Sequence, residues 1–363
     1  MRKNRLLIIL FLSVLVLPVL LYPFLSPYMD TENYENRTLA EFPSLKDGTS
    51  FLDGFTVWFN DHLPYKNQMV SLHSNLFLSL FNATPNPRVV VGEDGWLYYN
   101  NYDAENPIDD ILGRSAFSAE EMGRIQKNLS EAGASLGERD ISFVFLLAPN
   151  KESIYREHLP EYLLSVAVPE TRADVLVSGL SEDEFVLVYP RDALLYGKDN
   201  WQLYYRYDTH WNKLGAYIGF REICERLGIV LPELESLTVT EKEGYPRDLS
   251  DLAGIGNRCT DDSDYEISDL YPEVTWDMEK ENGATIYRSN AEDPRSVLIV
   301  HDSYYRSMTD YFPKVFSTVI SVDRDYGDLY SVHELIDLYE PDIVVMEVVE
   351  RGIQILLHDN MPY

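Results

Sequence analysis

Two short segments of the chain carry the side chains of nucleophilic catalysis. The first, YDTHWN at residues 207–212, places Asp208 two positions before His210. The second, HDSYY at residues 301–305, places Ser303 directly after an apolar run. A serine hydroxyl becomes a nucleophile when an imidazole takes its proton, and a carboxylate orients that imidazole. Asp208, His210 and Ser303 can therefore form a triad if the fold brings the two segments together.

The position of Ser303 favours this hypothesis. The run VLIV at residues 297–300 is typical of a buried strand, and we expect a helix to begin near Ser303. Reactive groups of parallel α/β sheets lie at the carboxyl ends of the strands. A helix N-terminus there offers backbone N–H groups to a developing oxyanion, and we expect the N–H groups of Ser303 and Tyr304 in that role.

The residues alone leave other interpretations open. Short motifs of this kind also arise by chance, so Asp-x-His before a helix can be an ordinary turn. Asp208 and His210 can also bind a metal ion, but their spacing supplies no third ligand. We therefore expect neither a metal nor a cofactor.

Alternating strands and helices must position these residues. Continuous apolar runs predict strands at residues 141–147, 185–189, 297–300, 315–322 and 343–348. Periodicity and capping signals predict helices at residues 118–137, 170–180, 212–227 and 331–340. This alternation predicts an α/β fold with a mostly parallel sheet covered on both faces. Residues 229–290 are rich in acids and turn formers, and we expect them to form an insertion.

The N-terminus predicts a membrane segment. Three basic residues within positions 2–5 precede an uncharged run at residues 6–25, and acidic residues follow it. Twenty residues can span the ~30 Å hydrocarbon core of a bilayer, and the charges place the rest of the chain outside the cytoplasm. A cleaved signal peptide is the alternative. We expect an anchor at residues 1–28, an N-terminal extension packing on the core at residues 29–100, and a catalytic domain at residues 101–363.

The charge of the chain excludes some partners. Its 60 acidic and 30 basic residues give a formal net charge of -30. Such a field repels nucleic acid, so we expect no nucleic-acid partner. Two cysteines, Cys224 and Cys259, form no zinc or redox motif and leave a disulfide open.

The ordered motifs of the chain resemble a bacterial family. Asp-Thr-His-Trp-Asn at residues 208–212, followed by Gly-Ala-Tyr at 215–217 and a strand ending in His-Asp-Ser, looks like the DHHW and alginate-O-acetylation group of SGNH-hydrolase-like proteins. The segments GEDGWLYY (residues 92–99), PNKESIYREHLP (149–160) and PDIVVMEVVER (341–351) also resemble that group. Together these motifs cover most of residues 35–351.

The resemblance implies a three-layer α/β/α fold in which Asp and His precede the nucleophilic serine. Carried over, Ser303 matches the nucleophile, His210 the base and Asp208 its orienting acid. Many SGNH proteins have glycine where His301 stands, and no separate segment with an oxyanion asparagine is found. Further candidates for oxyanion or substrate contacts are Tyr304, Trp211, Lys151, His301 and Glu347. For His301 we favour a hydrogen-bonded structural role, and for Trp211 packing beneath the His210 loop. A solvated side chain is the alternative for Lys151, and Glu347 is a candidate to line the pocket.

The resemblance further implies an O-acetyltransferase that acts outside the cell membrane on a cell-surface glycan. A membrane-bound O-acyltransferase is the implied source of the acetyl group. Two alternatives stay open: an acetylesterase that uses the same triad with water as acceptor, and a polysaccharide-binding protein without catalytic activity.

Overall fold

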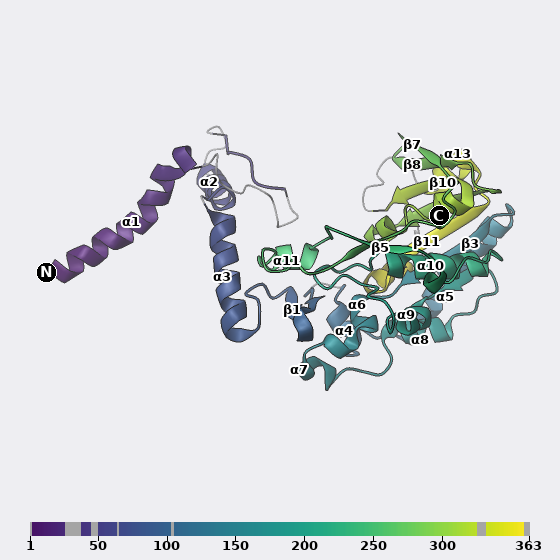
Figure 1. Cartoon of the computed structure of the whole chain (residues 1–363), viewed down its shortest axis with the longest axis horizontal. Coiled ribbons are helices and arrows are strands. Elements are labelled where there is room, and N and C mark those ends of the chain that lie inside the picture. Colours follow the sequence, from purple (N-terminus) through teal and green to yellow (C-terminus); the bar gives the residue numbers. More distant parts are fainter. Residues whose placement is uncertain are drawn as a thin grey trace. The chain divides into compact units, whose positions relative to one another are not determined.

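The computed structural model describes residues 2–25, 38–44, 50–63, 65–102, 105–324 and 332–358. The chain divides into two compact units, whose elements are labelled in Figure 1. Residues 1–87 and 250–260 form the first unit, and residues 88–249 and 261–363 form the second.

The first unit holds three helices: α1 (Arg2–Leu25), α2 (Ser50–Asp61) and α3 (Lys66–Phe81). Residues 250–260 attach to α3 through side chains, because Asn75 Nδ2 donates to Asn257 Oδ1 at 3.0 Å and an Arg258 guanidinium nitrogen donates to Ser79 Oγ at 2.9 Å. The run predicted to span a membrane lies within α1. Among the described residues, however, no helix is both long and apolar enough to cross a bilayer, so the predicted transmembrane helix is not supported.

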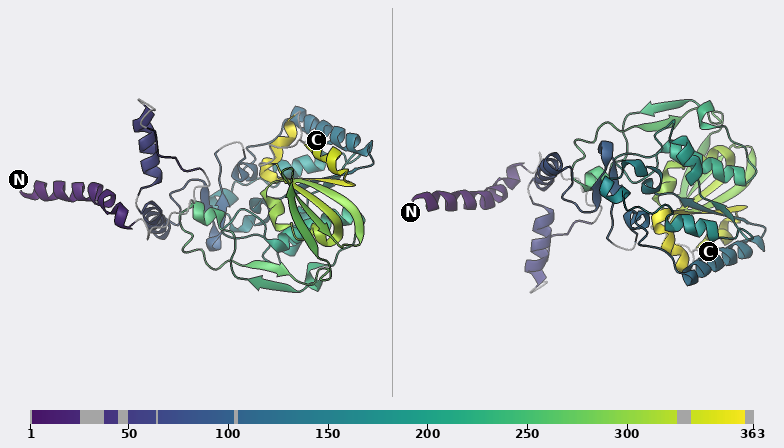
Figure 2. Two further views of the ribbon diagram at one scale, coloured as in Figure 1. Left: turned by 90° about the horizontal axis from the view of Figure 1, so that it is seen from above. Right: turned by 90° about the horizontal axis from the view of Figure 1, so that it is seen from below.

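A twisted sheet forms the centre of the second unit (Figure 2). In the described part of the chain it has seven strands in the order β4-β3-β11-β9-β10-β8-β7. Their bounds are β3 (Ser142–Ala148), β4 (Val186–Val188), β7 (Trp276–Glu281), β8 (Ala284–Ser289), β9 (Asp293–His301), β10 (Phe316–Asp323) and β11 (Ile343–Val349). Every predicted strand is present within a few residues of its expected position.

The sheet is mixed rather than mostly parallel as expected. Strands β4, β3, β11, β9 and β10 run parallel, but β8 pairs antiparallel with β10 and β7 pairs antiparallel with β8. Strands β7 and β8 lie inside residues 229–290, which the sequence analysis treated as an insertion. Asn282 and Gly283 join them in left-handed conformations, with φ of 53° and 78°. An Asn-Gly pair of this kind makes a two-residue turn, which joins antiparallel strands and cannot join parallel ones.

Helices cover both faces of the sheet, as expected for a three-layer α/β/α fold. Alternate residues of β3 point into different cores, with Phe145 in one cluster and Leu146 in the other. Helices α5, α8 and α13 pack into the first cluster, and α9, α10 and α12 into the second. Their bounds are α5 (Ala119–Gly137), α8 (Arg172–Gly179), α9 (Arg191–Gly197), α10 (Lys213–Arg226), α12 (Phe312–Val315) and α13 (Val332–Tyr339).

Smaller elements complete the second unit. Strands β1 (Val89–Val91) and β2 (Leu97–Tyr99) form an antiparallel hairpin that belongs to this unit. A second two-stranded sheet consists of β5 (Val239–Lys242) and β6 (Asp264–Ile267). Short helices are α4 (Pro107–Ile111), α6 (Lys151–Ile154), α7 (Glu161–Leu164), η3 (Glu93–Gly95), η4 (Arg156–His158), η5 (Leu234–Ser236), η6 (Ser303–Ser307) and η7 (Glu350–Leu357). Helix α11 (Asp248–Leu252) spans the point where the chain passes from the second unit to the first. Both cysteines are buried, and no disulfide joins them.

Candidate active site

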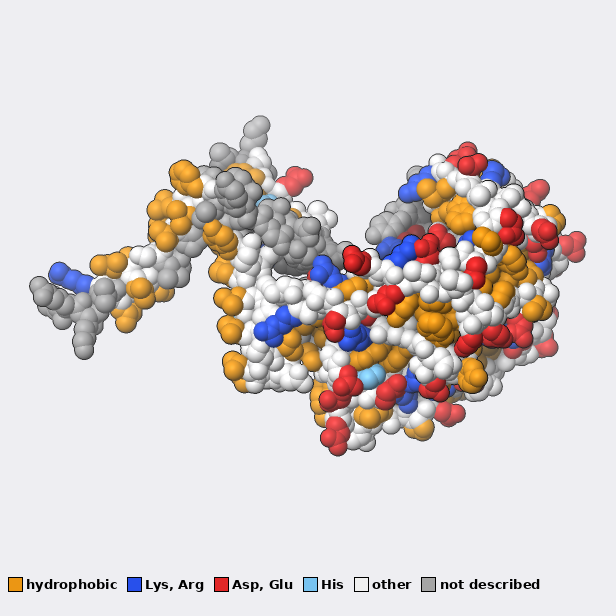
Figure 3. Space-filling view, viewed as in Figure 1, with side chains coloured by type: hydrophobic (Ala, Val, Ile, Leu, Met, Phe, Trp, Pro, Cys, Tyr) orange, Lys and Arg blue, Asp and Glu red, His pale blue; other side chains and the backbone are white. Residues whose placement is uncertain are grey.

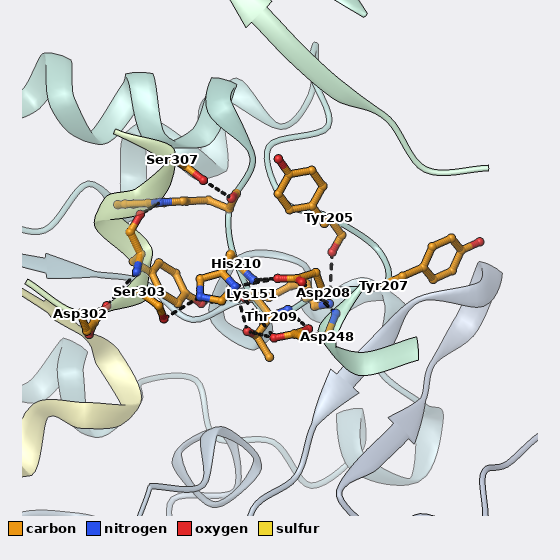
Figure 4. Close-up of polar contacts among 12 residues, drawn as sticks. Lys151, Tyr205, Tyr207, Asp208, Thr209, His210, Asp248, Asp302, Ser303 and Ser307 are labelled. Carbon is orange, nitrogen blue, oxygen red and sulfur yellow. Dashed lines mark hydrogen bonds and ion pairs between the residues drawn. The ribbon is translucent and has the colours of Figure 1, made fainter. Parts of the chain in front are cut away.

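The structure brings together the three residues that the two sequence segments supply (Figure 4). His210 Nε2 lies 2.7 Å from Ser303 Oγ, and His210 Nδ1 lies 2.6 Å from Asp208 Oδ1. One ring nitrogen thus faces a hydroxyl and the other faces a carboxylate. With Nδ1–H donating to Asp208, Nε2 is free to accept the hydroxyl proton of Ser303.

Asp208 is buried but remains ionised. Its carboxylate accepts the backbone N–H groups of His210 at 3.0 Å and of Asp248 at 2.9 Å. Burial raises the pKa of Asp208, but hydrogen bonding and charge attraction with His210 more than reverse this and lower the pKa to about 2. Asp208 is therefore a carboxylate at neutral pH, able to hold the His210 ring and to stabilise its protonated form.

The start of α10 fixes the direction of the segment that carries His210. Asn212 caps this helix, since its side-chain oxygen accepts the N–H groups of Leu214 and Gly215 at 3.0 and 3.1 Å. Gly215 permits a close approach, because a Cβ at this position would lie 2.4 Å from the carbonyl oxygen of Leu203. The helix consequently begins in close contact with the segment at Leu203, which helps to fix the backbone that carries His210.

Trp211 and Tyr304 tie the two catalytic segments together. Trp211 is fully buried, and its Nε1–H donates to the carbonyl oxygen of Tyr304 at 2.9 Å. The Tyr304 hydroxyl in turn donates to the carbonyl oxygen of Thr209 at 2.7 Å. Trp211 therefore packs beneath the His210 segment, and its buried ring presents no face to a sugar.

The Tyr304 N–H group, which was expected to face the oxyanion, already has an acceptor. That N–H donates to Asp302 Oδ1 at 2.9 Å, because Asp302 caps η6. The Tyr304 N–H is therefore already hydrogen-bonded within the protein, and the Tyr304 side chain is buried. The Ser303 N–H group is the first of η6, where an N–H has no acceptor within its own helix.

Lys151 positions the catalytic segment from beneath. Its side chain is fully buried, and Nζ donates to the carbonyl oxygen of Asp208 at 2.6 Å and to those of Tyr205 and Arg206 at 3.2 Å each. The β1–β2 hairpin covers the ammonium group, which lies 5.4 Å from the ring centre of Tyr98. Burial lowers the pKa of Lys151, and nearby carboxylates oppose that shift. Lys151 therefore does not reach a substrate, contrary to the expected contact.

His301 and Glu347 support the Ser303 turn from behind. Glu347 Oε2 accepts the N–H of Asp302 at 2.9 Å, and His301 Nδ1–H donates to the carbonyl oxygen of Asp302 at 2.7 Å. Burial and the charge of Asp302 raise the pKa of Glu347 well above its usual value and favour the protonated acid. Both side chains are buried, so His301 has the hydrogen-bonded environment of a structural histidine and Glu347 does not line an open pocket.

Asp248 was not among the predicted site residues. Its carboxylate accepts the Thr209 N–H at 2.9 Å and the Thr209 hydroxyl at 2.7 Å, and one oxygen lies 3.9 Å from His210 Nδ1. A partly buried position and the charge of Asp208 raise the pKa of Asp248 to about 6. No sequence signal links Asp248 to the catalytic segment, because it lies some forty positions away in the acid-rich region.

Asp248 also supplies the third ligand that the metal hypothesis lacked. Within the described residues, one ligand atom from each of Asp208, His210 and Asp248 lies within 4.8 Å of the others. The atoms are already used, however: Asp208 holds the Nδ1–H of His210, and Asp248 holds Thr209. The hydrogen-bond pattern therefore fits the triad better than a metal site.

Comparison with known proteins now places the chain in a family. Residues 89–308 match the family described as ALGX, an SGNH hydrolase-like domain of acetyltransferase AlgX. The chain belongs to this family. The matched residues include Asp208, His210 and Ser303.

Relatives of this AlgX-family chain include proteins named probable alginate O-acetylase AlgJ. The protein of Pseudomonas aeruginosa is 25% identical over 189 residues, covering 51% of this chain and 43% of that protein. The protein of Pseudomonas syringae pv. tomato is 27% identical over 172 residues, covering 46% of this chain and 39% of that protein. The AlgX-family chain thus spans less than half the length of these two relatives.

Two solved structures share the fold of the AlgX-family chain. A DHHW family protein from Eubacterium siraeum superposes with a TM-score of 0.52 at 17% identity, covering 75% of this chain and 92% of that one. Bacillus cereus PatB1, solved with a sulfonyl adduct, gives a TM-score of 0.53 at 15% identity, covering 73% of this chain and 97% of that one. The fold is accordingly the SGNH-hydrolase-like α/β fold that the motifs predicted.

Proposed function

We propose that the chain is an O-acetyltransferase that moves an acetyl group to a hydroxyl of a polysaccharide, with Ser303 as the covalent carrier. The observation that carries this proposal is the unbroken hydrogen-bond chain from Asp208 through His210 to Ser303 Oγ. Family membership and the names of the AlgJ relatives support the acetyl group and the polysaccharide acceptor.

In the first half-reaction, Ser303 Oγ attacks the carbonyl carbon of an acetyl donor while His210 Nε2 takes the hydroxyl proton. The tetrahedral intermediate then collapses, the donor's leaving group departs with the proton from His210, and acetyl-Ser303 remains. Asp208 stays a carboxylate throughout and stabilises the imidazolium that forms between the two steps. We assign the Ser303 N–H to the oxyanion, because its place at the start of η6 leaves it without an intrahelical acceptor.

In the second half-reaction, a sugar hydroxyl takes the place of the donor. His210 Nε2 removes its proton as the oxygen attacks acetyl-Ser303, and the same proton returns to Ser303 Oγ when the ester bond to the enzyme breaks. The transfer needs no metal or redox step, since every bond formed is matched by one broken. Water in place of the sugar would make the same site an esterase.

The place of action is part of the proposal. The basic residues before the apolar run and the acidic residues after it support a location outside the cytoplasm. The family resemblance supports a membrane-bound O-acyltransferase as the supplier of the acetyl group. Protease treatment of intact cells tests the location, because an extracytoplasmic chain is digested without lysis and a cytoplasmic chain is protected.

Acetyl transfer by the full chain tests the proposed reaction. The chain is incubated with p-nitrophenyl acetate, with and without polysaccharide, and both released acetate and polymer-bound acetyl are measured. We expect polymer-bound acetyl with the natural chain and a loss of about 10³-fold or more with Ser303→Ala. The matched control is Ser178→Ala on α8, whose exposed hydroxyl only donates to the Val175 carbonyl oxygen.

Each alternative has its own outcome. Acetate release with no polymer-bound acetyl for any polymer would identify an esterase. Unchanged acetylation in Ser303→Ala, or polymer binding without turnover in the natural chain, would contradict the serine mechanism.

A further inference from the structure

Charge distinguishes the polysaccharides that this site can accept. Some polysaccharides are uncharged, and others, such as polymers of uronic acids, carry a carboxylate on each sugar. A polyanion is attracted by a surface with unpaired cations and repelled by a surface with unpaired acids. The charges around Ser303 therefore bear on the acceptor.

The surface of the chain is acidic. Its formal net charge is -30, and Figure 3 shows acidic side chains spread over the viewed face of the second unit. At an ionic strength of 0.1 M the screening length is about 10 Å, so a field of this sign reaches an approaching polymer. The long-range term opposes the approach of a polyanion.

In the part of the chain that the structure describes, several cations on or near the catalytic segments already have partners. Those on the catalytic segments and their neighbours are engaged as follows: Arg206 with Asp261 and Asp262, Lys213 with Asp310, Arg306 with Asp323, and Arg324 with Asp302. Lys151 is fully buried under three carbonyl oxygens. Arg351 lies over the rings of Tyr304 and Tyr99, 5.3 and 5.9 Å from their centres. A carboxylate on the acceptor would compete with an existing partner at each of these cations.

Asp248 is an exposed acid beside the reacting atoms. The Asp248 side chain is 42% exposed, and its carboxylate lies 3.9 Å from His210 Nδ1. Its hydrogen-bond donors both come from Thr209, which is neutral. A sugar carboxylate held near His210 would meet this charge directly. A like charge placed against a partner disfavours its binding and so contributes to specificity.

We infer that the acceptor is a polysaccharide without anionic groups, and that this chain does not acetylate a polyuronate efficiently. The inference rests on the proposed acetyl transfer and narrows its substrate. It also separates this chain from the relatives named for alginate, which is a polyuronate. Family membership alone would suggest an anionic acceptor.

The test compares polymers that differ in charge and little else. The full chain receives p-nitrophenyl acetate together with alginate oligosaccharides or with the same oligosaccharides after methyl esterification, which removes the charge and adds no hydroxyl. A panel of uncharged polymers, a glucan and a mannan, is measured alongside. We expect at least one uncharged acceptor to gain acetyl about tenfold faster than native alginate at 0.1 M salt, with the ratio falling towards one at 1 M salt.

The outcomes separate this inference from the proposed function. A burst of p-nitrophenolate reports acetyl-Ser303, so its absence counts against the serine mechanism itself. A normal burst with faster acetylation of native alginate than of every uncharged polymer would overturn the inference alone. So would a normal burst with no acetyl on any uncharged polymer.

A charge variant gives a second readout. Asp248→Asn keeps the shape of the side chain and one of the two oxygens that accept from Thr209, but it removes the exposed charge. We expect the acetylation rate of native alginate, divided by that of the methyl-esterified oligosaccharides, to rise by about threefold or more. This ratio does not depend on the burst rate. Glu235→Gln, an exposed acid on η5 away from the triad, is the matched control and leaves the ratio unchanged. A ratio that does not move in Asp248→Asn would contradict the charge argument.

Discussion

At the scale of single residues, the site depends on where the protons of the His210 ring and the Ser303 hydroxyl lie. Asp208 accepts three N–H groups, two from the backbone and one from the His210 ring. The Asp208 carboxylate selects the His210 tautomer in which Nδ1 carries the proton, so that Nε2 can accept the proton of Ser303. The segments YDTH (residues 207–210) and HDS (residues 301–303) therefore supply the residues of the triad, but only the fold determines that the segments meet.

Replacing Asp208 by Asn tests the tautomer argument. The amide can donate to Nδ1 and so favours the ring form whose Nε2 carries the proton, which cannot accept the proton of Ser303. We expect a loss of about 10³- to 10⁴-fold in acetyl-enzyme formation with the fold intact. Pre-steady-state p-nitrophenolate release measures this loss, and a loss below tenfold would contradict the role of Asp208.

The depressed pKa of Asp208 also predicts a pH dependence of stability. A folded-state pKa of about 2 lies below the ordinary value of 3.8, so the carboxylate adds stability that is fully present above about pH 4. That stability is lost as the pH falls through 2, because the folded state must then take up the proton. Urea unfolding between pH 2 and 5 is expected to be steeper in pH for the natural chain than for Asp208→Asn, and equal slopes would contradict the assignment.

Lys151 is expected to act through position alone. Lys151→Met keeps the bulk of the side chain but releases three carbonyl oxygens of the catalytic segment. We expect the free energy of unfolding to fall by about 2–4 kcal/mol and kcat for acetyl transfer to fall by about 100-fold, with KM for the acceptor little changed. Lys127→Met on the exposed face of α5 is the control. A selective rise in KM would instead indicate direct substrate contact.

Glu347 is expected to work as a neutral acid behind Ser303. Glu347→Gln keeps an oxygen for the Asp302 N–H without a charge, so we expect stability within about 1 kcal/mol of the natural chain. Glu347→Ala leaves that N–H unpaired and opens a cavity, which costs about 2–4 kcal/mol. Denaturant unfolding compares them, and equal losses in both variants would contradict the hydrogen-bond role.

At the scale of elements, the sequence predicted what periodicity can reveal. The buried runs of β3, β9, β10 and β11 are apolar on both faces, so strand type, helix alternation and a layered fold followed from them. The order of the strands and the direction of β7 and β8 did not, because pairing depends on side-chain packing between distant segments. The Asn282-Gly283 pair was the available signal for that hairpin, and the surrounding acids concealed it.

The same limit applies to the site. Ser303, His210 and Asp208 stood out because their residue types and order carry chemistry. Asp248, and the use of the Tyr304 N–H by Asp302, were beyond prediction because they are contacts between loops. Trp211 and Lys151 were recognised as important, but only burial shows that they position others.

The start of α10 provides a test at this scale. Gly215→Ala places a Cβ where the Leu203 carbonyl oxygen lies 2.4 Å away, so the helix must move and carry His210 with it. We expect a loss of about 1–3 kcal/mol in unfolding free energy together with a fall in acetyl transfer. Gly123→Ala on α5 is the matched control, since nothing lies within 4 Å of its added Cβ. Full activity and stability in Gly215→Ala would show that this contact does not position the imidazole.

At the scale of the whole molecule, family and charge give different kinds of information. Membership of the AlgX family and the SGNH-like fold support the chemistry of acetyl transfer. The acidic surface is a property of this chain, and it bears on which polymer approaches the site. The two arguments are independent, so the chemistry stands even if the acceptor proves to be charged.

The central claim is that Ser303 carries the acetyl group, and one measurement tests it directly. The full chain is mixed with p-nitrophenyl acetate without acceptor, quenched in acid, digested and analysed by mass spectrometry. The account predicts acetyl on the peptide containing Ser303, and none there in His210→Ala. Turnover of the ester with acetyl on a different residue, or on no residue while Ser303→Ala remains active, would contradict it.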